Sequence, residues 1–269
     1  MDSQSLSQPD QVPAYIVQAE SGKVAAGMEN AAGQIIVPLL CVAQPLTPAV
    51  VNRQGLDAGD LFLHTEPNVP LLKFGEERRF VAGFQFTEFI EWYHRDSPIR
   101  GFRARSSDPK GDLAKICAEQ WLKRKPGQQR VAYDANKSPE QQTHVDENIV
   151  FVLLFEGHLN EMIAMPLART KHKKGKLLLS YAARRGNGSV PLYGGTYVMR
   201  TVTEKNAQGQ TYFNFEFRNP GGQESWPTPD EYKAGEALYK VMKERYHKLA
   251  LDDQQAAAEE TAVAETKDF

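Results

Sequence analysis

The stretch ENIVFVLLFE, from Glu147 to Glu156, decides the fold class. It is a nearly continuous apolar run, long enough to form a central strand of a sheet. In a second stretch, from Arg79 to Thr87, apolar residues recur at every second position, which predicts a half-buried strand. One face of this strand is expected to hold Phe80, Ala82, Phe84 and Phe86. The body of the protein is therefore expected to be β-rich.

Two later stretches, residues 195–203 and 210–217, predict a hairpin. The loop between them, Asn206 to Gly209, has the Asn and Gly that a four-residue hairpin loop favours. In the second strand one face is predicted to be core and holds Phe213, Phe215 and Phe217. Shorter strands are expected near residues 35–42 and 61–64.

The clearest helix signal lies near the C-terminus. Thr228 is an N-cap, Pro229 fits the first helical position, and Glu231 completes a capping box, so a helix is expected from about Pro229 to Leu249. Shorter helices are expected over residues 112–125 and 177–184. The predicted fold class is mainly β, a β-rich α+β fold with a C-terminal helix.

The composition changes along the chain and predicts three parts. Residues 1–33 are rich in Gln, Ser, Ala and Gly and predict a flexible arm. Residues 34–250 predict a single domain, in which the proline-punctuated segment 97–144 is an insertion or long connection. Residues 251–269 hold six acidic residues and one lysine, and predict a mobile acidic tail.

Composition excludes two classes of protein. The longest apolar stretch, Ile35 to Ala43, is broken by Pro38 and is far shorter than the roughly 20 residues of a spanning helix, and the first ten residues do not resemble a signal peptide. A cytoplasmic protein is expected. Cys41 and Cys117 have no CxxC partner, which excludes a disulfide scaffold, and Cys117 is predicted to be a small buried residue.

The net charge of −2 is a sum of opposed segments. Residues 162–203 contain eight basic and no acidic side chains, residues 100–130 sum to +6, and residues 251–269 sum to −5. A basic face that only keeps the protein soluble usually mixes both signs. That reading stays open, but the absence of acids in the 42-residue segment 162–203 favours an anionic partner.

Catalytic motifs are absent from the sequence. It has no P-loop, no dinucleotide-binding GxGxxG after a strand, no GxSxG elbow and no HExxH. The six histidines are scattered, and although His94 and His144 lie near acids, their spacing does not force a metal site. We therefore expect no enzyme activity, no metal and no cofactor.

Basic side chains interleaved with aromatic rings are typical of proteins that bind single-stranded DNA, because cations neutralise phosphates and rings stack on bases without reading sequence. Each tyrosine could equally be a half-buried core residue. Trp121 leans towards the core because it shares helical spacing with Leu113 and Cys117. The predicted phosphate contacts are Arg169, Lys171, Lys173, Lys174, Lys176, Arg184 and Arg185, with Arg103, Arg105, Lys123 and Arg124 from the insertion, and the predicted stacking residues are Tyr181, Tyr193, Tyr197 and Tyr212.

A strand-rich body with basic and aromatic stretches and an acidic tail ending in Asp268-Phe269 resembles the single-stranded-DNA-binding proteins of bacteria and tailed bacteriophages. The segments Val37 to Gln44 with Gly59-Asp60, and Pro191 to Gly194 with Thr211 to Phe213, are similar to a phage group of such proteins. The resemblance implies an OB-fold-like barrel and host cytoplasm. It also implies a tail that recruits partner proteins through Asp268 and Phe269. Lys267 and the larger insertion depart from that pattern.

The sequence therefore predicts sequence-independent binding of single-stranded DNA in replication, recombination and repair. The predicted partners are single-stranded DNA and, through the tail, replication or recombination proteins; a homodimer is compatible with the sequence, and no membrane is expected. Two alternatives stay open. One is a nuclease or recombination enzyme of phage DNA metabolism, and the other is an interaction factor that acts on a host polymerase.

Overall fold

A computed structural model describes residues 37–94, 96–123, 136–206 and 209–245 of the chain. The predicted arm, residues 1–33, and the predicted tail, residues 251–269 with Asp268 and Phe269, lie outside these ranges, as does Arg124. The strands and helices below all belong to the described ranges.

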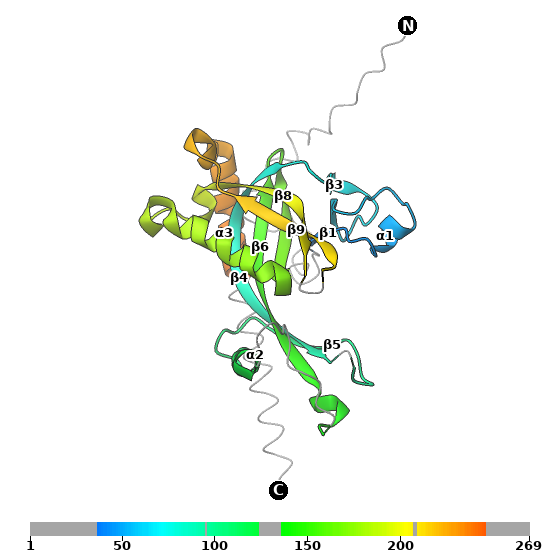
Figure 1. The fold of residues 1–269 in the computed structure, drawn as a ribbon. Coiled ribbons are helices and arrows are strands. Elements are labelled where there is room, and N and C mark those ends of the chain that lie inside the picture. The colour runs from blue at the N-terminus through cyan, green and yellow to red at the C-terminus, as the bar shows by residue number, and fades with distance from the viewer. Residues whose placement is uncertain (1–36, 95, 124–135, 207–208, 246–269) are drawn as a thin grey trace, which may run out of the picture. The chain divides into compact units, whose positions relative to one another are not determined.

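The largest element is a six-stranded antiparallel sheet with the order β7-β6-β4-β8-β9, in which β5 also pairs with β4 (Figure 1). The predicted central strand lies in β6, between β7 and β4. The sheet is strongly curled into an OB-like half barrel, so the predicted β-rich fold class is confirmed. Its strands are β4 (Arg78–Tyr93), β5 (Phe102–Ser106), β6 (Thr143–Phe155), β7 (His158–Ala168), β8 (Thr196–Lys205) and β9 (Thr211–Arg218).

A small second sheet connects the two edges of the curled sheet. It consists of β1 (Leu40–Val42), β2 (Leu61–Leu63) and β3 (Pro70–Leu72), with the short helix α1 (Pro48–Val51) between β1 and β2. Leu39 forms a parallel bridge to Ala164 of β7. The Gln44 side chain donates to the Phe213 carbonyl at 2.8 Å and accepts from the Phe213 N–H at 3.0 Å, which covers the edge of β9. The segment around β1 thus joins β7 to β9.

The inner face of the curled sheet forms the core. Phe80, Phe151, Phe155 and Phe215 are each 1% exposed or less. Phe217 belongs to the same cluster and Phe213 packs against it, which confirms the core face predicted for the second hairpin strand. The hairpin itself is also confirmed, since all of β9 pairs with Val198–Lys205 of β8.

A β-bulge at Gly83 corrects the predicted face of β4. Phe80 and Ala82 point into the main core, as predicted, but Phe84 and Phe86 pack on the opposite face with Val152 and Leu154. The register between β4 and β6 shifts between Ala82 and Phe84, so the extra residue inverts the alternation. Alternation read from the sequence alone assumes an unbroken ladder, and the bulge breaks it.

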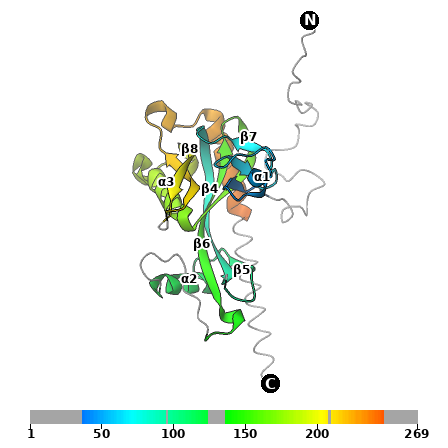
Figure 2. The same ribbon diagram turned by 45° about the vertical axis from the view of Figure 1, so that its right-hand side comes forward.

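Two helices pack on opposite sides of β4 (Figure 2). Helix α3 (His172–Arg184) places Leu178 in the main core, while the helix over residues 229–245 places Leu238 against Val152 and Leu154. The predicted capping box is confirmed: the Thr228 N–H donates to Glu231 Oε2 at 2.7 Å, and the Glu231 N–H donates to Thr228 Oγ1 at 3.3 Å. Gly83 has no room for a side chain, because a Cβ there would lie 2.4 Å from Leu238.

The predicted insertion folds at the far end of β4 and β6 (Figure 1). It contains β5, helix α2 (Asp112–Lys123) and the 3-10 turn η2 (Pro139–Gln141). The predicted helix is confirmed, whereas β5 was not predicted. Cys117 is 2% exposed and packs with Phe89 and Val145, as expected of a small buried residue. Trp121 is 52% exposed, so its predicted core position is wrong.

Candidate nucleic-acid interface

The acid-free segment 162–203 folds into the end of β7, the turn η3 (Arg169–Lys171), α3, the turns η4 (Arg185–Gly188) and η5 (Leu192–Gly194), and the start of β8. Acids from elsewhere in the chain reach part of this segment. Arg169 Nη2 lies 2.6 Å from Asp146 Oδ2, and Lys174 Nζ lies 2.7 Å from Glu204 Oε1. These cations are therefore less available to an anionic ligand than the charge count indicates.

Two further cations are built into the body of the protein. Arg185 is 7% exposed, its guanidinium lies 4.8 Å from the Tyr197 ring centre, and it donates to the Thr196 carbonyl and to Asn219 Oδ1. Lys171 Nζ lies 5.0 Å from the centre of the Phe215 ring, and burial lowers the pKa of its ammonium. The phosphate contact predicted for Arg185 needs an accessible guanidinium, and the structure buries it against aromatic rings.

Three predicted cations remain at the surface of α3: Lys173, Lys176 and Arg184 are exposed, and within the described residues no ion pair within 4 Å joins them to a carboxylate. Their spacing of three, eight and eleven positions places them on one side of the helix. The opposite side packs on the core through Gly175 and Leu178. The helix is thus amphipathic, with its cations facing away from the sheet.

The cations of the insertion are placed differently. Arg103 Nη1 lies 2.9 Å from Glu91 Oε1, and Arg105 Nη2 lies 3.5 Å from Glu88 Oε2; both carboxylates are largely buried. Lys123 pairs with Glu119 at 3.7 Å on the surface of α2. The three described candidates of the insertion are therefore neutralised locally.

The predicted stacking tyrosines separate into three environments. Tyr197 is fully buried, so its ring is not available to a base, which corrects the role predicted for it. Tyr212 donates its hydroxyl to Glu204 Oε2 at 2.8 Å, and burial together with that hydrogen bond raises its pKa to about 12. Tyr181 is half-buried against the main core. Tyr193 is half-buried and lines an open pocket.

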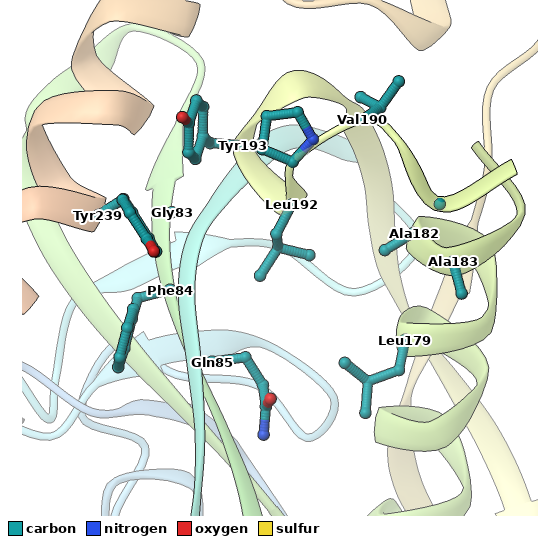
Figure 3. Close-up of a pocket in the computed structure, with 12 residues that line it drawn as sticks. Gly83, Phe84, Gln85, Leu179, Ala182, Ala183, Val190, Leu192, Tyr193 and Tyr239 are labelled. Atoms are coloured by element: carbon teal, nitrogen blue, oxygen red, sulfur yellow. The ribbon is translucent and has the colours of Figure 1, made fainter. Parts of the chain in front are cut away.

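That pocket lies beside α3 and has a volume of about 550 Å³ (Figure 3). We call it the slot. Its walls come from β4, from the second half of α3, from the segment that joins η4 to η5, and from the C-terminal helix; the lining residues that matter here are Phe84, Gln85, Leu179, Ala183, Tyr193 and Tyr239. The Tyr193 and Tyr239 ring centres lie 5.6 Å apart, and the Phe84 and Tyr239 ring centres lie 6.1 Å apart.

Sequence reasoning missed Tyr239 and the slot position of Phe84. Tyr239 follows Tyr232 by seven residues, which places both on one side of the C-terminal helix, and the Tyr193 ring contacts each of them. That spacing was a usable signal. Phe84 could not be assigned to this wall without the Gly83 bulge.

The fold and the site define a β-rich protein with a curled, OB-like sheet, a basic helix and an adjoining aromatic slot. The chain belongs to the Pam3 phage gp34-like protein family, whose family model matches residues 4–248. The phage context that the resemblance implied is confirmed at the level of the family. Neither a curated protein nor a solved structure gives a significant match.

Within the described ranges, no helix is long and apolar enough to cross a membrane. In the same part of the chain, no group of three or more His, Cys, Asp or Glu side chains is arranged to hold a metal ion.

Proposed function

We propose that this phage-family protein binds single-stranded DNA without sequence preference, and that it acts by binding and not by catalysis. The observation that supports this most is the outward side of α3, where Lys173, Lys176 and Arg184 lie together without described ion pairs. Eleven residues of helix span about 16 Å, which lets one extended strand run along the three cations. Cations that contact phosphates give affinity independent of sequence.

The slot supplies the second half of the proposal. Ala183 lies in its wall and adjoins Arg184, so a strand on α3 passes the mouth of the slot. Tyr193 and Tyr239 present aromatic rings there. Base stacking on such rings contributes about 1–3 kcal/mol per base and favours an unpaired strand, whose bases are free to leave the stack. A duplex offers no such bases.

The acidic tail fits the same function. In the proposed scheme the residues that end the sequence, Asp268 and Phe269, recruit replication or recombination proteins, so that the DNA-binding domain and the partner contact are separate parts of the chain. A pull-down of host replication proteins with the full chain, compared with a variant that lacks these two residues, tests this role. Equal recovery by both proteins rejects it.

The test of the main proposal is a titration of fluorescein-labelled oligo(dT) and of a matched duplex at several salt concentrations. The proposal expects tighter binding of the single strand and a logarithmic salt slope near −2, since three contacts release about 0.7 counterion each. Absence of binding at low salt, or equal affinity for the duplex, rejects it. Mg²⁺-dependent shortening of the oligonucleotide would instead indicate an enzyme.

A further inference from the structure

One edge of β4 has a gap in its pairing. On the side opposite β6, β8 pairs with Arg78–Val81 and β5 pairs with Phe89–Trp92, and within the described residues no strand pairs with the β4 residues between them. Both neighbours run antiparallel to β4. β8 and β5 therefore lie along the same edge of β4, and the β4 residues between them have no strand partner on that edge among the described residues.

The backbone groups that face this gap follow from the alternation of the ladder. The Tyr93 N–H donates to the Gly101 carbonyl at 3.0 Å, which puts the backbone of Tyr93 on the side of β5. The register between β4 and β6 is unbroken from Tyr93 back to Phe84, so every second residue faces the same side. Counting back by twos, the N–H and carbonyl groups of Thr87 and Gln85 point into the gap.

The slot lies over this gap and supplies its walls. Gln85 and Leu179 point into the same space between β4 and α3 (Figure 3). A Cβ on Gly175 would lie 3.2 Å from Ile149, and Ile149 is the cross-strand partner of Thr87, so this part of α3 is level with Thr87. Residues 84–87 are all half-buried, which leaves them accessible to an added strand.

Charges of both signs lie near the gap: Glu147 interacts electrostatically with Lys176, and Glu236 with Tyr193. Lys176 follows Gly175 directly and shares one side of α3 with Leu179 and Ala183, which line the slot. Lys243 Nζ lies 5.7 Å from the Tyr239 ring centre, at the opposite wall. Glu88, at one end of the gap, is largely buried and paired with Arg105. Lys176 and Lys243 are the cations that an acidic side chain of a partner would meet at these walls.

We propose that the gap in β4 binds an extended acidic peptide of another protein by strand addition. The peptide continues the line of β5 and β8, hydrogen-bonds to Gln85 and Thr87, places an apolar side chain in the slot and sets an acidic one near Lys176. η5 packs on β4 at the Gly83 end of the gap, so the open part is the stretch of about four residues around Gln85 and Thr87, roughly 13 Å long. An unpaired strand edge is the usual template for such binding. This goes beyond the proposed DNA binding, which uses the outward side of α3 and the rings at the mouth of the slot but not the backbone of Gln85 and Thr87.

The experiment uses the full chain and a labelled hexapeptide that alternates Val with Glu, with a Val-Lys hexapeptide as the charge control. Fluorescence anisotropy reports binding, and amide hydrogen exchange reports protection. The inference expects the acidic peptide to slow exchange at Gln85 and Thr87 by at least about tenfold. The inference is overturned if the Val-Glu peptide does not bind at millimolar concentration or if the Val-Lys peptide binds equally well. It is also overturned if oligo(dT) protects Gln85 and Thr87 from exchange and the Val-Glu peptide does not.

Two variants test the site, and the first of them also separates it from the DNA site. Thr87→Pro removes an N–H that faces the gap and leaves the ladder to β6 intact, while Thr87→Val, its matched control, keeps the N–H. Ala183→Trp fills the slot from an exposed position of α3 and does not alter β4. Both Thr87→Pro and Ala183→Trp are expected to lose peptide binding, and Thr87→Pro is expected to keep oligo(dT) binding. Peptide binding that survives both substitutions overturns the inference, whatever the DNA result.

Discussion

The insertion and the segment that contains α3 are similarly basic in the sequence, but their cations have different surroundings in the folded protein. Residues 100–130 sum to +6 and residues 162–203 to +8. In the insertion, Arg103, Arg105 and Lys123 each have a carboxylate within 4 Å, whereas none of the three cations on the outward side of α3 has one within that distance among the described residues. The net charge of a segment thus counts its cations, and the fold determines which of those cations remain accessible to an anionic ligand.

The largest expected effect tests this difference directly. Reversing the α3 cations in Lys173→Glu, Lys176→Glu and Arg184→Glu together is expected to weaken oligo(dT) binding by about 100-fold or more at low salt, because three phosphate contacts become repulsive. Fluorescence anisotropy measures it. The matched control reverses the charge of three lysines of the insertion, Lys110, Lys115 and Lys123. Equal losses in the two triple variants would remove the distinction between the regions.

A second prediction concerns what the cations of the insertion do. Arg103→Ala is expected to lower the free energy of unfolding by about 2 kcal/mol, because it leaves Glu91, 5% exposed, without its cation. Urea unfolding measures the loss. The double variant Arg103→Met with Glu91→Leu is expected to recover most of it, and oligo(dT) affinity is expected to stay unchanged. An Arg103→Ala protein as stable as the parent contradicts the structural role.

Lys171 of η3 is half-buried against Phe215, whereas the neighbouring Lys173 of α3 is exposed. Lys171→Met is expected to leave oligo(dT) binding unchanged and to raise stability by up to about 1 kcal/mol, since burial disfavours the ammonium and lowers its pKa. The pKa is lowered because the folded protein disfavours the charged form of Lys171. The free energy of unfolding of the parent protein should therefore rise as the pH increases from the lowered pKa to the ordinary value of 10.5. The Lys171→Met variant should lack that rise. Lys173→Met is the matched control, and it is expected to weaken binding. Weaker oligo(dT) binding by the Lys171→Met variant would show that Lys171 contacts the DNA, contrary to this prediction.

The smallest effect concerns the pairing of Lys174. Burial alone would raise the pKa of Glu204, but hydrogen bonds from Asn214, Lys174 and Tyr212 hold it below its ordinary value of 4.5. Its contribution to stability is therefore complete above pH 4.5 and is lost as the pH falls through the lowered folded pKa. Glu204→Gln is expected to cost about 1 kcal/mol near neutral pH and to flatten the acid part of a pH-dependent melting curve. A parallel curve would show that the pair adds no stability.

The sequence predicted elements better than faces and partners. The run from Glu147 to Glu156, the capping box at Thr228 and the 195–217 hairpin all became the expected elements, because local pattern determines them. The side chains of Phe84 and Phe86 were misplaced because a bulge at Gly83 reverses the face. Among the candidate site residues, Arg185 and Tyr197 became buried because pairs far apart in sequence decide burial, and local pattern does not report such pairs.

Lysine footprinting distinguishes a DNA interface on α3 from one on the insertion. The full chain is acetylated briefly with and without saturating oligo(dT), and mass spectrometry measures the modification of each lysine. The DNA interface proposed on α3 predicts that the oligonucleotide protects Lys173 and Lys176, while Lys115 and Lys123 of the insertion react at the same rate in both samples. Protection of Lys115 and Lys123 with full reactivity at Lys173 and Lys176 would contradict it.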